Sequence, residues 1–242
     1  MSISKSFATA LNDTTGSTPK TTRTTATFDT TGFTHILVGT KFEGGDTTVT
    51  PSSTAVSGSW TSHTKEIVAA TSSDLVGQLF SAVITSATTG RTATITFAAG
   101  RTFSTVAVWV MNATSGVIAL VAEANGEGTG TALDGGSLSN AGGDSVVSFM
   151  MCLEYSASTH TSAGWTGATN GAEDFDFGGS DNFTAGYSRG AETTNPIDPT
   201  ATQTNSAAWG VLSLMFKEDA GGAAALSIAP IIQNYRNMGL MQ

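Results

Sequence analysis

The chain has 242 residues and carries 10 Lys and Arg against 19 Asp and Glu, so its formal net charge is −9. Only 12% of the residues are charged, while 39% are hydrophobic. This balance excludes an intrinsically disordered chain, which combines low hydrophobicity with high net charge. The acidic charge and the lack of a basic run also exclude a protein that binds nucleic acid by neutralising its phosphates.

Residues 1–25 are rich in Thr, Ser, Asn and Asp and are predicted to form an N-terminal arm or an edge strand. They contain no apolar stretch of the length that a secretory signal needs. No part of the chain approaches 18 consecutive apolar residues, so we expect no transmembrane helix and no membrane partner. The sequence therefore predicts a protein that is made in the cytoplasm.

Short apolar runs follow, rich in β-branched and aromatic residues, and turn residues such as Thr89-Gly90, Ala99-Gly100 and Ser115-Gly116 separate them. The runs have the length and composition of strands. They cover residues 35–42, 66–70, 75–85, 92–97, 103–111, 117–122, 146–155 and 209–216. We therefore predict an all-β domain over residues 26–219, built as an antiparallel sandwich of two sheets with about eight to ten strands and arranged as a jelly roll.

Residues 220–242 differ in kind, because after a glycine hinge they contain no acid and only one full charge, Arg236. The segment is too apolar to remain in water and too short to form a core, which predicts a C-terminal tail that docks on a partner. Pro230 interrupts any continuous helix within it. The alternative is a segment that folds back on its own domain. The candidate anchors are Ile228, Ile231, Ile232, Tyr235, Met238 and Leu240.

The most chemically suggestive segment is an acidic, Gly-rich stretch that contains Asp174, Asp176 and Asp181. Their carboxylates are hard oxygen ligands of the kind that Ca²⁺ prefers, although the spacing is not that of a helical calcium loop. Paired carboxylates also occur in glycosidases, at separations that a sequence does not give. A third interpretation is a solvated loop with Phe175 and Phe177 pointing inward. Apart from this calcium site, no cofactor is expected.

Three aromatic residues, Trp60, Trp165 and Tyr187, lie in Thr- and Gly-rich surroundings and could form a stacking platform for a sugar. The alternative is that they belong to the core, as large aromatics of sandwiches usually do. Trp109 and Trp209 lie inside dense apolar runs and are expected in the core.

Residues that could carry catalysis give little support for an enzyme. Cys152 is the only cysteine and lies in an apolar run, so we expect a buried small hydrophobe. His35, His63 and His160 share no metal-binding spacing. The chain also lacks the Gly-x-Ser-x-Gly elbow of an α/β-hydrolase. We therefore expect a protein without enzymatic activity.

A resemblance in style to a known class of proteins covers most of residues 26–218. It is carried by residues 33–42, 103–112 and 207–216, together with the Thr- and Gly-rich middle and the tail. They resemble the jelly-roll structural proteins of tailed bacteriophages, although no diagnostic motif is present. The resemblance implies a virion protein, first of all a trimeric capsid cement or decoration protein that binds the major capsid protein or another virion protein. The alternative is a tail or receptor-binding module whose loops at 156–207 bind a host glycan. A secreted carbohydrate-active enzyme is a third class.

Overall fold

The computed structural model describes residues 2–13, 18–45, 48–68, 74–140, 144–154, 159–160, 165, 172–177, 184–193 and 195–219. Over these residues the protein is all-β, with antiparallel pairing throughout and no helix, and hence no helix that could cross a membrane. The strands are β1 (Ile3–Asp13), β2 (Lys20–Thr24), β3 (His35–Glu43), β4 (Val49–Ser53), β5 (Thr61–Val68), β6 (Leu75–Val83), β7 (Ala93–Arg101), β8 (Ser104–Ala113), β9 (Ile118–Asp134), β10 (Val146–Glu154), β11 (Ala172–Asp176), β12 (Thr184–Glu192) and β13 (Thr200–Glu218).

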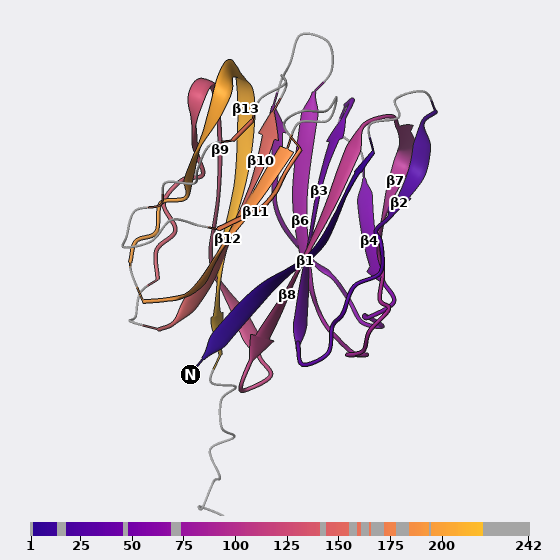
Figure 1. Cartoon of the computed structure of the whole chain (residues 1–242), viewed down its shortest axis with the longest axis vertical. Helices are drawn as coiled ribbons and strands as arrows, with labels where there is room; N and C mark the ends of the chain where they lie inside the picture. Colours follow the sequence, from indigo (N-terminus) through magenta and orange to yellow (C-terminus); the bar gives the residue numbers. More distant parts are fainter. Residues whose placement is uncertain are drawn as a thin grey trace, which may run out of the picture.

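The strands form three sheets where the sequence predicted two. The central sheet has the order β1-β8-β3-β6-β5, the small sheet β2-β7-β4, and the outer sheet β11-β12-β10-β13-β9. Figure 1 shows them as layers side by side, with the central sheet between the other two. Three pairs within β1 to β8 join strands from opposite ends of that segment: β1 with β8, β2 with β7, and β3 with β6.

The central sheet is buried on both faces. This explains why the sequence predicted two sheets where the structure has three. All residues from His35 to Phe42 of β3 are buried. Ile36 and Val38 belong to the core shared with the small sheet, whereas Leu37 belongs to the core shared with the outer sheet. A strand with two covered faces has a continuous apolar sequence, and such a run does not indicate that two different sheets cover it.

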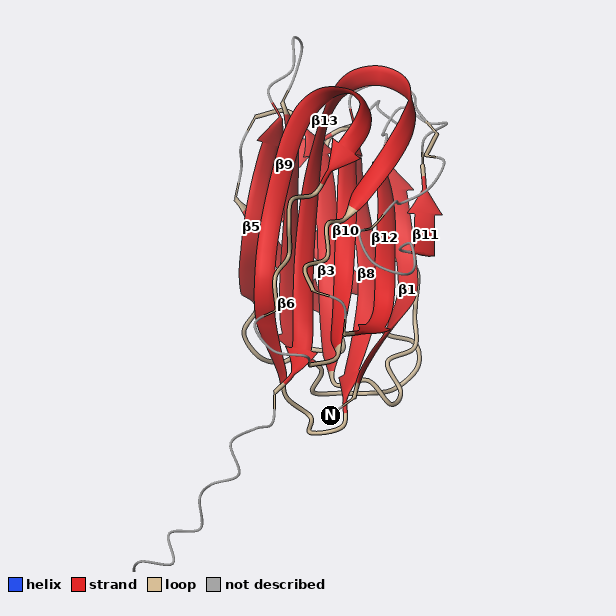
Figure 2. Cartoon of the chain, turned by 90° about the vertical axis from the view of Figure 1, so that its left-hand side faces the viewer, coloured by secondary structure: helices blue, strands red, loops and turns tan. Residues whose placement is uncertain are grey.

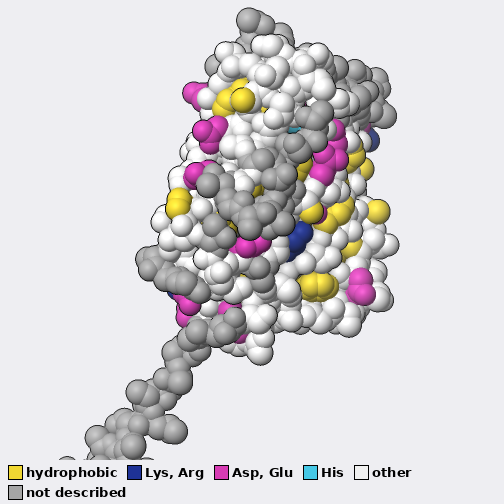
Figure 3. All heavy atoms as spheres, turned by 60° about the vertical axis from the view of Figure 1, so that its left-hand side comes forward, with side chains coloured by type: hydrophobic (Ala, Val, Ile, Leu, Met, Phe, Trp, Pro, Cys, Tyr) yellow, Lys and Arg dark blue, Asp and Glu magenta, His cyan; other side chains and the backbone are white. Residues whose placement is uncertain are grey.

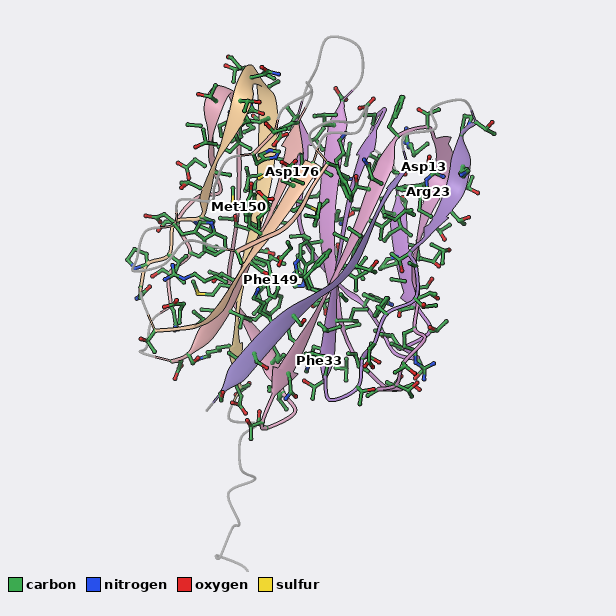
Figure 4. All side chains as sticks on the ribbon, in the orientation of Figure 1. Asp13, Arg23, Phe33, Phe149, Met150 and Asp176 are labelled. Atoms are coloured by element: carbon green, nitrogen blue, oxygen red, sulfur yellow. The ribbon has the colours of Figure 1, made fainter. Side chains whose placement is uncertain are left out.

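The core between the central and outer sheets is centred on Trp109, which is fully buried. Its indole makes an edge-to-face contact with Phe149 of β10, and the two ring centroids lie 5.8 Å apart. Figure 4 labels Phe149, which belongs to this core, and its neighbour Met150, which lies on the opposite face of β10. Close approach of the two sheets depends on Gly77, where an added Cβ would lie 2.5 Å from Cδ1 of Leu153.

A third core covers the far face of the outer sheet. The two longest strands, β9 and β13, pair along most of their length, with a register shift between Thr202 and Ala207. Figure 2 shows this ribbon curling over at one end of the molecule. Its far leg then lies over the sheet, so that Leu133 and Ala201 join Met150 in the third core.

Each of the eight predicted apolar runs contains strand residues, of β3, β5 to β10 and β13, and the ends of several runs differ from the strand ends by one or two residues. Residues 3–13 form β1, the edge strand that was one of the two possibilities for the N-terminus. Gly116 has a φ of +74° in the turn between β8 and β9, as its predicted turn requires. The turn expected at Ala99-Gly100 is wrong, because both residues lie within β7.

Candidate functional site

The described part of the acidic segment lies mainly in β11, a short strand at the edge of the outer sheet. Asp181 lies outside the described residues. Asp174 and Asp176, although only two positions apart, contact different partners and belong to two separate polar clusters. The register shift between Glu173 and Phe175 interrupts the regular alternation of the strand at this point.

The first cluster surrounds Asp174. Its Oδ2 accepts hydrogen bonds from Trp109 Nε1, at 2.7 Å, and from the hydroxyl of Ser188. Lys5 Nζ donates to the Ser188 hydroxyl at 2.5 Å and lies 3.9 Å from Asp174 Oδ1. Burial raises the pKa of Asp174, while the hydrogen bonds and the charge of Lys5 act in the opposite direction. The cluster therefore joins β1 and β8 of the central sheet to β11 and β12 of the outer sheet.

The second cluster places His160 between two carboxylates. His160 Nδ1 lies 3.0 Å from Asp176 Oδ1, and Nε2 contacts Glu154 Oε1. The backbone N–H of His160 also donates to Asp176 Oδ2 at 2.9 Å. Burial alone would lower the pKa of His160, but the hydrogen bonds and charges of Glu154 and Asp176 raise it overall. Burial raises the pKa of Glu154 as well, and the bond with His160 opposes that shift.

A buried lysine belongs to the same region. The side chain of Lys41 is 0% exposed, and its Nζ lies 3.4 Å from Glu43 Oε1. Burial lowers the pKa of Lys41 to about 8, while the charges of Glu43 and Glu154 oppose the shift. Lys41 and His160 thus share Glu154 as a neighbouring carboxylate.

Chemically, this cluster can share a proton along the line from Glu154 through His160 to Asp176. Two buried atoms of this region, Glu154 Oε2 and the hydroxyl of Tyr187, have no hydrogen-bond partner. The rings of His160 and Tyr187 meet edge to face, with centroids 6.3 Å apart. Within the described part of the chain, no group of three or more His, Cys, Asp or Glu is arranged to hold a metal ion.

The three aromatics proposed as a sugar platform are not brought together. Trp165 and Tyr187 are buried in the third core, with exposures of 4% and 0%. Trp60 is half-buried and packs against the first core, between the central and small sheets. The buried positions expected for Trp109 and Trp209 are confirmed.

Cys152 is buried, as predicted, and burial raises the pKa of its thiol well above the usual range. The proposed tail anchors Ile228, Ile231, Ile232, Tyr235, Met238 and Leu240 all lie outside the described residues.

Sequence reasoning missed Glu154, Lys41 and Lys5, and it gave His160 no role. A weak signal was present for two of them. Lys41 is the one charged residue in the apolar run 35–42, and Glu154 is an acid near the end of the run 146–155. A charge inside such a run has to find a buried partner, because an isolated buried charge is very costly.

Comparisons of the chain with protein-family models, with curated proteins and with solved structures found no match. The function is therefore argued from the sequence and the geometry alone.

Proposed function

We propose that the chain is a non-enzymatic structural protein of a tailed-phage virion, and specifically a cement protein on the outside of the capsid. The observation that carries this proposal is the strand order of β1 to β8. It supports a jelly roll, an architecture that recurs in viral capsid proteins and in lectins. Because a fold alone does not determine function, the proposal also rests on the resemblance in sequence.

The jelly-roll assignment follows from how a long hairpin rolls up. If eight strands first pair as a hairpin, the first lies against the eighth, the second against the seventh and the third against the sixth. All three of these pairs are present here. Rolling such a hairpin then brings β8 beside β3 and β7 beside β4, and both of these pairs are also present. The one departure is the fourth pair of the hairpin, because β5 lies beside β6 in the central sheet and not beside β4.

The use of charged groups also favours a structural role. Asp174 and Lys5 join two sheets, and His160 joins Glu154 to Asp176, so these ionisable groups are engaged in contacts within the fold. A block of three stacked antiparallel sheets suits a protein that stabilises a lattice and does not need to move.

The proposal also includes self-association of the chain and docking of its C-terminal tail on a partner. Edge strands expose unpaired backbone groups, so the edges of the central sheet at β1 and β5 call for cover, and a trimer would supply it. The partner is the major capsid protein or another virion protein, and residues 220–242 would dock on it.

Two double substitutions test the docking. Ile231→Asp with Ile232→Asp adds two charges and removes two anchors, whereas Asn234→Asp with Asn237→Asp adds the same charge and keeps every anchor. We expect both variants to melt like the parent chain, and only the first to stop cosedimenting with empty capsids of the virus that encodes it. Equal retention of both variants, or no cosedimentation of the parent chain, would contradict the proposal. Light scattering tests the trimer, and a monomer at micromolar concentration contradicts it.

A further inference from the structure

An open cavity of about 360 Å³ lies against the ribbon that β9 and β13 form. Small-molecule sites usually occupy about 300–1,000 Å³, so this one has room for a ligand of about one or two rings. Two legs of the ribbon contribute to it. Its lining residues are Asn125, Gly126, Glu127, Asp134, Gly136 and Trp209.

The indole of Trp209 forms one wall of the cavity and packs against glycines of β9. An added Cβ at Gly128 would lie 2.6 Å from Cζ2 of Trp209, and one at Gly126 would lie 2.1 Å from the backbone oxygen of Asp134. Side chains at these two positions would therefore displace the indole and the folded-back leg. Trp209 is only 7% exposed, yet its Nε1 has no hydrogen-bond partner.

Two buried polar atoms on residues outside the cavity lining also lack partners. Glu154 lies directly opposite Trp209 in the register of β10 and β13, and its Oε2 is unpaired. Gln203 donates to the backbone oxygen of Gly130 at 2.5 Å, but its Oε1 is unpaired. More than about 90% of buried polar groups in proteins have a partner, so the unpaired indole N–H of Trp209, a residue that lines the cavity, indicates a missing acceptor.

The charge of the lining limits the chemistry of that ligand. Glu127 and Asp134 have no cationic partner among the described residues. On the face of the molecule drawn in Figure 3, acidic side chains are more widespread than basic ones. An anion would be repelled by the two carboxylates. A cation would suit them but would offer no acceptor to the indole N–H. A neutral polyol supplies both donors and acceptors.

We infer that this cavity binds a neutral sugar, one hydroxyl of which accepts from the indole N–H of Trp209 while others lie toward Glu127, Asp134 and Asn125. Asn125 is suited to this role because its Nδ2 is already bound to Glu66, which orients the amide and leaves Oδ1 as an acceptor. This site is separate from the one proposed for docking on a capsid, and it uses none of the three aromatics Trp60, Trp165 and Tyr187.

The test is binding of the full chain to a glycan array, followed by calorimetric titration with the methyl glycoside of the terminal sugar that binds best. Trp209→Phe removes the Nε1 donor and keeps an aromatic ring, and Glu127→Gln removes one exposed carboxylate. Trp60→Phe is the matched control, because Trp60 packs on the far side of the central sheet. Melting temperatures establish that each variant is folded.

We expect saturable binding by the parent chain, a loss of affinity of at least about tenfold in the Trp209 and Glu127 variants, and no change in the Trp60 variant. If Trp209→Phe fails to fold, the Glu127→Gln result decides. Lack of binding to every neutral glycan, tighter binding of tetramethylammonium than of any sugar, or equal affinity in all folded variants would overturn the inference.

Discussion

Asp13 at the end of β1 and Arg23 in β2 form a buried ion pair, with Arg23 Nε 3.0 Å from Asp13 Oδ2 (Figure 4). The two side chains are 8% and 2% exposed. Arg23 Nη2 also donates to the backbone oxygen of Arg101 at 2.7 Å. Burial lowers the pKa of Arg23, and the charge of Asp13 opposes that shift. The pair ties an edge strand of the central sheet to the small sheet.

Removing the charge of Asp13 should leave the guanidinium of Arg23 buried without a counterion. We therefore expect Asp13→Asn to lower the free energy of unfolding by about 3 kcal/mol, measured by urea denaturation. Lys20 also contacts Asp13, at 3.1 Å, but its side chain is 54% exposed. Lys20→Met is thus the control and should cost less than about 1 kcal/mol. Similar small losses in both variants would show that the buried pair contributes little.

Gly77 should not tolerate a methyl group. In Gly77→Ala the new Cβ would lie 2.5 Å from Leu153 Cδ1 and 2.9 Å from Leu212 Cδ1, and both leucines are fully buried. We expect the free energy of unfolding to fall by about 2 kcal/mol because the two sheets must separate or repack. Gly58→Ala is the control, since a Cβ there meets nothing within 4 Å. A loss below about 0.5 kcal/mol in Gly77→Ala would mean that the core adapts freely.

The stability that His160 provides should depend on pH. Its pKa is raised in the folded state, so its contribution is fully present below about pH 6.5 and is lost as the pH rises through the folded-state pKa. We expect the stability gap between the parent chain and His160→Gln to shrink between about pH 6 and about pH 9.

His35 supplies the opposite control for this experiment. Burial lowers its pKa, so its contribution is present above about pH 6.5 and is lost as the pH falls. The gap between the parent chain and His35→Gln should therefore widen over the same rise in pH. Parallel behaviour of the two variants would contradict the assigned environment of His160.

Cys152 should be inert in the folded chain. It is 0% exposed, and burial, together with the charges of Glu154 and Asp176, raises the pKa of its thiol. Because the thiolate is the reactive form, iodoacetamide should modify Cys152 only at the rate of unfolding. The Ser59→Cys variant carries a thiol at an exposed position and should gain one rapidly modified group. Rapid modification of Cys152 in native buffer would show that the outer sheet opens locally.

The strands with two buried faces were the easiest part of the fold to predict, because β3, β8 and β10 are continuous apolar runs. The far legs of β9 and β13 could not be predicted in the same way. Residues 125–131 alternate Gly with polar residues, and they form a strand only because β13 provides a partner along much of their length. Tertiary pairing decides the structure of such a segment, and local composition does not.

The same limit applied to the candidate site. The acids at Asp174 and Asp176 stood out in the sequence, but their partners come from distant strands. Lys5 is separated from Ser188, with which it shares a hydrogen bond, by 183 positions. Such contacts depend on the register of β1 and β12, and no spacing rule within one segment predicts them.

The central sheet serves as a common wall for the two cores beside it, which limits how the chain can be divided. A fragment that ended after β8 would keep both sheets of the proposed jelly roll, but would present Leu37, Leu79, Trp109 and Met111 to water. A fragment that began at β9 would expose the matching face of the outer sheet, including Phe149 and Leu214. Neither half is therefore an autonomous module that could be fused to another protein or exchanged between genes without the other half.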